Sequence, residues 1–306
     1  MYITVVVISV AAIYLLSGVI FAQMITHAHR QAIVHTPAAY GMDYEDVTFK
    51  SQDGLDLKGW FIPGNADKSI IITHPFPFNR HGFLKRNQGW LPLFKTDVDL
   101  LKTAQQIHAA GYNVLMFDFR NHGESQAGIT GIGLNESLDV IGAVDYLKTR
   151  FSAVAHQIGF VSFCMGANST LIAMSKLKAD FKPVKCVVAI QPVSALVFVR
   201  SYLKATFTRL SLVLIPLVDR LVQGFGGYPL VEMSPLGYCA DVQVPVLYIQ
   251  GKHDPWTELE DIQSFYDATP NEKVLHLIED KMRRFEVYNL IGEQPEKVLA
   301  FLGKYM

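Results

Sequence analysis

The residues around Cys164 combine a reactive side chain with the small residues that a sharp turn requires. Residues 158–163 form an apolar strand pattern, Cys164-Met165-Gly166 follows, and a helix pattern continues from there. A thiol at the apex of such a turn can attack a carbonyl carbon, because a free cysteine is already a few per cent thiolate at neutral pH. The alternative interpretation is a buried, chemically inert cysteine on a core strand.

Other polar residues follow apolar strand patterns elsewhere in the chain. The pattern of residues 244–250 predicts a strand that runs into Gly251-Lys252-His253-Asp254-Pro255, and residues 69–73 predict a strand that ends at His74. Asp254 suits the role of a carboxylate that orients a general base, or that of a turn residue before Pro255. His74 and His253 are the histidines best placed to act as a base.

The frame Ser162-x-Cys164-x-Gly166 resembles the nucleophile elbow G-x-S-x-G of the α/β-hydrolase superfamily, and in particular its small-lid esterase-like members, with cysteine in place of serine. The resemblance covers residues 45–306. It implies Cys164 as the nucleophile and Asp254 as the acid that follows it. It also implies backbone N–H donors for the oxyanion at Met165 and at Phe76, since the preceding Pro75 has no N–H.

The resemblance fails at the general base. In this family a histidine follows the last strand, whereas residues 279–288 of this chain contain none. Arg283, or its neighbour Arg284, stands where the histidine is expected. An arginine stays protonated and cannot act as a base, but it could stabilise a thiolate or hold an anionic substrate.

Among the histidines, His74 is the preferred substitute base and His253 the other candidate. His122 lies in a segment that resembles the family's D-x-R-G-x-G-x-S loop and is interpreted as structural. His276 lies inside the last strand pattern, where we expect a packed residue.

Alternation of short apolar runs with helix patterns predicts βαβ units and a mostly parallel central sheet flanked by helices. The expected strands are residues 45–50, 55–62, 69–73, 113–118, 158–163, 186–191, 244–250 and 273–278. The alternation breaks at residues 193–235, which are rich in apolar side chains. This segment is either a small helical lid, as the resemblance implies, or helices packed on the sheet as core.

Composition excludes several classes of protein. The 306 residues carry 27 basic and 28 acidic side chains, a net charge of −1, so we expect no nucleic-acid partner. Three scattered cysteines, Cys164, Cys186 and Cys239, favour neither a disulfide framework nor a zinc site. We expect no cofactor and no metal.

Residues 2–24 contain no charged side chain and would span about 35 Å as a helix, enough to cross a bilayer. We interpret residues 1–24 as a transmembrane anchor and residues 25–44 as a linker. The rivals are a cleaved signal peptide, which normally has a basic start, and a buried helix, which normally has a polar face. Arg30 after the span predicts a body on the cytoplasmic side.

The sequence therefore predicts a membrane-anchored α/β-hydrolase that cleaves an ester or thioester of a hydrophobic, lipid-like acyl substrate through Cys164. The alternative is a catalytically inactive protein of the same fold that serves as a membrane-associated binding or scaffold module.

Overall fold

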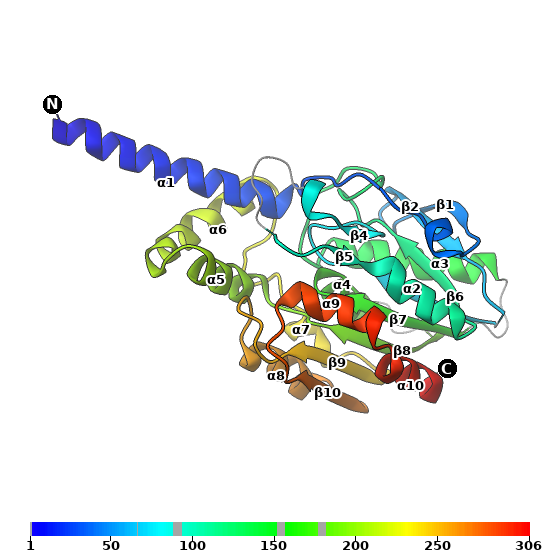
Figure 1. Ribbon diagram of the computed structural model, residues 1–306. Coiled ribbons are helices and arrows are strands. Elements are labelled where there is room, and N and C mark those ends of the chain that lie inside the picture. The colour runs from blue at the N-terminus through cyan, green and yellow to red at the C-terminus, as the bar shows by residue number, and fades with distance from the viewer. Residues whose placement is uncertain (1, 66, 88–93, 152–156, 177–181) are drawn as a thin grey trace.

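A computed structural model describes residues 2–65, 67–87, 94–151, 157–176 and 182–306 of the chain (Figure 1). Its centre is an eight-stranded sheet in the order β1-β2-β6-β3-β7-β8-β9-β10. The first two pairings, β1 with β2 and β2 with β6, are antiparallel, and the other five are parallel. This confirms the predicted mostly parallel sheet. The strands are β1 Glu45–Lys50, β2 Asp56–Ile62, β3 Lys68–Thr73, β6 Asn113–Phe117, β7 Gln157–Phe163, β8 Val184–Ile190, β9 Val246–Gly251 and β10 Lys273–Ile278.

Helices cover both faces of the sheet. The central strands are apolar throughout because both of their faces are buried: Ile70 and Ile72 of β3 lie in one core cluster, and Ile71 lies in the other. The first cluster includes side chains of α2 (Leu100–Ala109), α9 (Arg284–Glu293) and α10 (Glu296–Tyr305). The second includes side chains of α3 (Glu136–Arg150), α4 (Met165–Lys176) and α8 (Leu259–Ala268).

The segment between Val193 and Pro235, which we call the inserted segment, stands beside the sheet rather than on it (Figure 1). It contains α5 (Ala195–Thr206), the 3₁₀ helix η3 (Arg209–Leu214) and α6 (Ile215–Gly224), and the short helix α7 (Leu236–Cys239) follows it. Its buried side chains form a third cluster that also includes Ala22 of the N-terminal helix. The inserted segment thus packs partly against the start of the chain.

The N-terminal helix α1 runs from Tyr2 to Thr26, and its apolar stretch has a mean hydropathy of 2.6, so it is long and apolar enough to cross a membrane. Most of its first sixteen residues are exposed, whereas Gly18, Ala22 and Thr26 are buried. A Cβ added at Gly18 would lie 2.5 Å from Leu217 Cδ2 of α6. The last third of α1 is therefore docked against α6, Tyr14 contacts Val213 of η3, and most of the residues before Tyr14 are exposed.

Short elements complete the chain. The 3₁₀ helix η1 (Pro37–Tyr40) lies in the segment expected as a linker, and η2 (Lys85–Asn87) lies between two short strands. These strands, β4 (Gly82–Phe83) and β5 (Val98–Asp99), pair antiparallel.

Candidate functional site

Cys164 stands at the turn between β7 and α4, in a backbone conformation that few residues adopt. Its φ is 51°, in the left-handed region that is uncommon for residues other than glycine. Its N–H donates to the carbonyl of Ile190 at 2.8 Å, and its own carbonyl accepts from the N–H of Asn168 at 3.0 Å. Such strain persists where the surrounding structure fixes it, and it is concentrated at functional sites. Cys164 is 7% exposed and borders a pocket.

The small residues on either side of Cys164 bring strand and helix close together. A Cβ at Gly166 would lie 2.5 Å from Thr73 Oγ1 and 2.8 Å from the Thr73 carbonyl oxygen, so a larger residue does not fit there. Ser162 Oγ and Thr170 Oγ1 share a hydrogen bond of 2.9 Å that joins β7 to α4. As the first residue of α4, Met165 has a backbone N–H without an acceptor inside the helix. Phe76 borders the same pocket as the thiol.

The sequence predicts Arg283, or its neighbour Arg284, where the family has a histidine. In the structure the side chain beside Asp254 is that of Arg284. Helix α9 begins at Arg284, so Arg283 is its N-cap residue and is exposed. The Arg284 side chain is buried, and its Nη1 donates to Asp254 Oδ2 at 2.6 Å. Its Nε donates to the Tyr288 hydroxyl at 2.8 Å, and its Nη2 donates to the carbonyl of Gln191. The guanidinium is thereby held on several sides.

Asp254 orients this arginine. Besides the bond from Arg284, its Oδ2 accepts from Gln191 Nε2 at 2.9 Å, and its Oδ1 accepts from the backbone N–H of Trp256 at 3.0 Å. Gln191, at the end of β8, and Tyr288, in α9, were not among the predicted site residues. Gln191 could have been identified from the sequence, because it is a polar residue at the carboxyl end of an apolar strand pattern.

The charges at this site are strongly perturbed. Burial disfavours the charged guanidinium, but its interactions with Tyr288, Cys164 and Asp254 outweigh burial and raise the pKa of Arg284 well above its ordinary value. Burial also raises the pKa of Tyr288 well above its ordinary value, against the opposing charge of Arg284 and with a contribution from Cys164. Arg284 therefore stays charged and Tyr288 stays protonated. Cys164 contributes to both pKa shifts, and neither side chain can accept the proton of its thiol.

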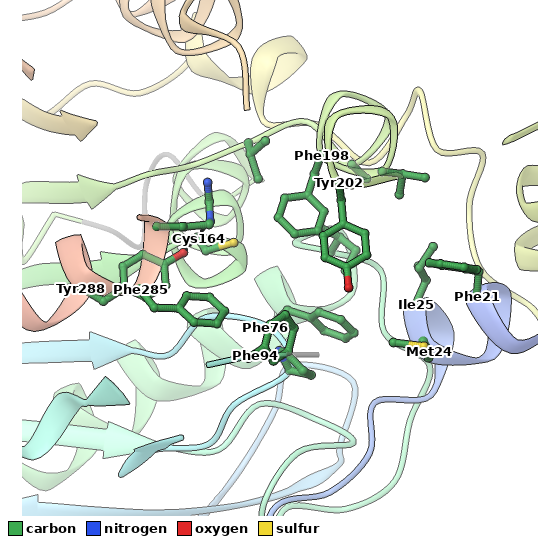
Figure 2. Close-up of a pocket in the computed structure, with 16 residues that line it drawn as sticks. Phe21, Met24, Ile25, Phe76, Phe94, Cys164, Phe198, Tyr202, Phe285 and Tyr288 are labelled. Carbon is green, nitrogen blue, oxygen red and sulfur yellow. Dashed lines mark hydrogen bonds between the residues drawn. The ribbon is translucent and has the colours of Figure 1, made fainter. Parts of the chain in front are cut away.

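The pocket runs from the thiol to the end of α1. Figure 2 shows Cys164 near Phe285 and Tyr288 at one end, Phe76, Phe94, Phe198 and Tyr202 between, and Phe21, Met24 and Ile25 of α1 at the other end. It encloses about 870 Å³, counting space open to solvent. The remaining lining residues are Pro77, Ile132, Val193, Ala195, Val199 and Arg284. Apart from the thiol, the tyrosine hydroxyls and Arg284, the lining side chains are apolar, which suits a hydrocarbon chain.

Comparison with solved structures identifies proteins of similar fold. The chain is similar to the Pyrococcus furiosus esterase Pf2001, with 25% identity, a TM-score of 0.68 and coverage of 91% of this chain and 99% of that one. Its fold also matches that of the α/β hydrolase GrgF from Penicillium sp. sh18, at 18% identity and a TM-score of 0.61 over 87% of this chain and 99% of that one. The chain has the α/β-hydrolase fold.

Curated relatives carry no described activity. The protein YqkD of Bacillus subtilis is 29% identical over 246 residues, which are 78% of this chain and 72% of the relative. The protein YfhR of Escherichia coli K12 is 26% identical over 252 residues, 79% of this chain and 75% of the relative. No family model matches the chain.

None of the histidines that the structure describes lies where it could replace the missing base. His74, the preferred candidate, is buried, and its Nε2 accepts from the N–H of Phe119 at 3.0 Å. Its Nδ1 therefore carries the proton and donates to the carbonyl of Pro75 at 2.9 Å. Burial lowers the pKa of His74 well below its ordinary value. With both ring nitrogens engaged by the backbone, His74 cannot serve as the base.

The pocket that borders the thiol is not lined by His253, His122 or His276. His253 is exposed, and His122 is buried with its Nδ1 donating to the carbonyl of Arg120 at 2.8 Å. His276 is half-buried on β10. None of the 16 described residues that line the pocket is a histidine.

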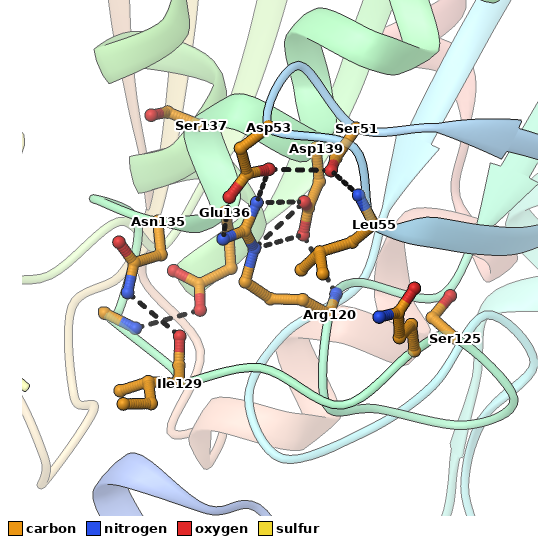
Figure 3. A network of polar contacts seen from close by, with 12 residues as sticks. Ser51, Asp53, Leu55, Arg120, Ser125, Ile129, Asn135, Glu136, Ser137 and Asp139 are labelled. Carbon is orange, nitrogen blue, oxygen red and sulfur yellow. Dashed lines mark hydrogen bonds and ion pairs between the residues drawn. The ribbon is translucent and has the colours of Figure 1, made fainter. Parts of the chain in front are cut away.

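A buried polar network shapes the pocket wall near α1 (Figure 3). Arg120 Nη2 lies 2.7 Å from Asp139 Oδ1, and its Nη1 lies 2.9 Å from Asp53 Oδ2. Glu136 accepts from the N–H groups of residues 131 and 133, at 2.9 and 2.7 Å. The loop held in this way contains Ile132, which lines the pocket. In the same loop the N–H of residue 130 donates to the Thr26 carbonyl of α1 at 3.0 Å. We interpret the network as structural.

Proposed function

We propose that this protein is a membrane-anchored acyl hydrolase in which Cys164 attacks the carbonyl carbon of an ester or thioester with a hydrophobic acyl chain. The observation that carries the proposal is the strained Cys164, with a φ of 51°, at the end of an apolar pocket. The likeness to an esterase of the same fold supports ester-type chemistry. The length and hydropathy of α1 support the anchor.

The attacking species is the thiolate. Arg284 and Tyr288 cannot remove the thiol proton, but the positive charge of Arg284, which borders the same pocket, attracts the negative charge of an attacking thiolate. When the thiolate attacks, a carbon–sulfur bond forms and the carbonyl π electrons move to oxygen. The N–H groups of Met165 and Phe76 are the donors we assign to this oxyanion. The tetrahedral intermediate then collapses and expels the leaving group.

Among the described residues that line the pocket, no side chain can act as a general base, so thioesters should be better substrates than alkyl esters. A thiolate leaves without a proton, so the exchange of one thiolate for another needs neither an acid nor a base. An alkoxide needs a proton, and the raised pKa values of Arg284 and Tyr288 make both poor acids. We therefore assign acyl thioesters, and esters with weakly basic leaving groups, as the substrate class.

The second candidate is a non-catalytic module of the same fold. The observation that favours it is the Arg284–Asp254 ion pair, which occupies the place of the base and leaves hydrolysis of an acyl-enzyme without one. The two candidates differ in one measurable property, the formation of a covalent acyl group on Cys164.

The test uses the full-length protein in detergent micelles with a medium-chain acyl thioester and the matching p-nitrophenyl ester. We expect a burst of product equal to one acyl group per chain, followed by slow turnover, and an acylated Cys164 in the mass spectrum. Cys164→Ala abolishes the burst. Cys186→Ala, which removes a thiol buried in β8, is the matched control and retains it. Equal rates for the wild type and Cys164→Ala, with no labelling of Cys164 by iodoacetamide, would leave the binding module as the remaining function.

A further inference from the structure

We infer that the acyl chain of a membrane amphiphile reaches Cys164 directly from the bilayer, between α1 and the inserted segment, so that α1 forms part of the substrate site. This rests on the proposed function for its chemistry but not for its geometry. The observation behind it is that Phe21, Met24 and Ile25 of α1 line the same pocket as the thiol (Figure 2).

Two faces of α1 have different partners. Gly18, Ala22 and Thr26 recur every four residues and are buried, so they form the face that is docked to the body. Phe21, Met24 and Ile25 follow the i, i+3, i+4 spacing of a second face, which closes one end of the pocket. A helix that served only as a tether would not need to supply this wall.

The position of these residues along α1 matches the depth of a lipid's carbonyl groups. The 25 residues of α1 span about 37 Å, close to the thickness of a bilayer with part of its headgroup region. Phe21 lies about 8 Å from the end of the helix at Thr26. The α1 end of the pocket therefore lies at the boundary between hydrocarbon and headgroups, where an amphiphile changes from chain to polar group.

The tip of the inserted segment extends deeper. Phe207, Leu210 and Val213 are 52%, 79% and 61% exposed, which is unusual for apolar residues so close together. Tyr14 of α1 donates a hydrogen bond from its hydroxyl to the Val213 carbonyl at 3.1 Å. The rings of Phe21 and Phe207 lie 5.9 Å apart in an edge-to-face arrangement.

These contacts fix the depth of the tip. Tyr14 precedes Thr26 by twelve residues, about 18 Å along the helix. If α1 spans the bilayer, the three exposed side chains lie in hydrocarbon, and the long side chain of Arg209 can extend toward the headgroups. The cavity between α1 and α5 is then bordered by lipid.

The first arm of the test measures binding without catalysis. Full-length protein is reconstituted in phosphatidylcholine vesicles that contain a phosphatidylcholine with a photoactivatable group at the end of one acyl chain. We expect cross-links to α5 residues that line the pocket, Phe198 and Tyr202, as well as to α1. Cross-links confined to the exposed residues 3–16 of α1 would overturn the inference, whether or not the protein is an enzyme.

The second arm compares a short, water-soluble acyl thioester with a palmitoyl thioester in the same vesicles, and follows acylation of Cys164. Met24→Trp fills the α1 end of the pocket and should lower the ratio of the long-chain to the short-chain acylation rate roughly tenfold. Ile13→Trp is the matched control, because Ile13 is 65% exposed on the same helix, and should change neither rate.

Leu210→Asp tests the tip without disturbing packing, because Leu210 is largely exposed. It should slow long-chain acylation in vesicles but not the short-chain reaction. The inference would be overturned if Met24→Trp and Leu210→Asp each changed the long-chain and short-chain acylation rates by the same factor, or changed neither rate. If neither thioester acylates the wild type while the cross-links appear in α5, the proposed function fails and bilayer access stands.

Discussion

Replacing Asp254 by asparagine leaves the Arg284 guanidinium buried without its counter-charge. The two side chains are 0% and 2% exposed, and the atoms Oδ2 and Nη1 lie 2.6 Å apart. Removing one partner of such a pair costs about 3–5 kcal/mol, because the remaining charge stays desolvated. Globular proteins have unfolding free energies of about 5–15 kcal/mol, so this one substitution removes a large fraction of the stability.

The cost converts into a shift of the thermal midpoint. With an unfolding entropy of about 2.1 cal/mol/K per residue, the roughly 280 residues after α1 give ~0.6 kcal/mol/K, and Asp254→Asn should lower the midpoint by about 5–8 °C. The measurement is thermal unfolding of the full-length protein in detergent micelles, followed by circular dichroism. Glu279→Gln, which breaks the exposed pair with Lys252, is the control and should move the midpoint little.

A double-mutant cycle identifies the charge as the cause. Arg284→Met together with Asp254→Asn removes both charges, and buried pairs replaced by neutral side chains cost little or even stabilise. We expect the double variant to be at least as stable as Asp254→Asn alone, so that the two single effects do not add. Additive effects, or a midpoint for Asp254→Asn no lower than that of Glu279→Gln, would refute the assignment of a buried ion pair.

Three further predictions concern the base, the elbow and acid stability. Arg284→His should speed the slow turnover after the burst by about 100-fold, because an imidazole can activate water; steady-state kinetics on the medium-chain thioester would show no gain if deacylation is not limiting. Gly166→Ala should cost about 1–3 kcal/mol by thermal unfolding, because its Cβ would meet Thr73, whereas Gly237→Ala, with nothing within 4 Å, should be neutral. Burial lowers the pKa of His122 to about 4, so from about pH 6.5 down to 4 the unfolded chain binds more protons and stability falls by about 1.4 kcal/mol per pH unit. His122→Gln should flatten the dependence of the thermal midpoint on pH over that range, and an unchanged slope would contradict the assignment.

The strands of this fold could be predicted because central strands leave a short, continuous apolar run in the sequence, and the edge strand of residues 45–50 leaves an alternation of apolar and polar residues. The ranges expected at residues 45–50 and 273–278 are those of β1 and β10, and the range 69–73 differs from β3 by one residue. Order along the chain placed Cys164 and Asp254 at strand ends, which parallel strands bring to one edge of the sheet. The strand ranges and these two strand-end positions follow from the spacing of residues along the sequence, without knowledge of tertiary contacts.

Spacing along the sequence could not decide whether Arg283 or Arg284 lies at the site. It depends on the residue at which α9 begins, and one residue more or less turns a side chain by about 100° around the helix axis. Similarly, His74 ends a strand in the right region, but its availability depends on the N–H of Phe119, which reaches Nε2 from the neighbouring β6 side of the sheet. These outcomes are set by contacts between segments far apart in sequence.

Docking of α1 is a third feature that hydropathy alone does not reveal. A uniformly apolar helix is expected to face lipid on all sides, yet Gly18, Ala22 and Thr26 face protein. The signal was present as small residues at every fourth position, the spacing at which helices in membranes approach one another closely. The close approach of Gly18 to Leu217 is what that spacing permits.

The Arg284–Asp254 ion pair has unequal effects on the two halves of the proposed reaction. Acylation by a thioester begins with one thiolate and ends with another, so fixed donors such as Arg284 and Tyr288 can assist it without moving a proton. Deacylation by water must remove a proton from the attacking water, and a general base contributes about 10²–10⁴-fold to such a step. Because the charge of Arg284 is balanced by Asp254 and its pKa is raised, Arg284 cannot be this base, and no described residue that lines the pocket is a histidine. The acyl group should therefore remain on Cys164 far longer than it takes to form, and the enzyme should accumulate in the acylated state whenever substrate is present.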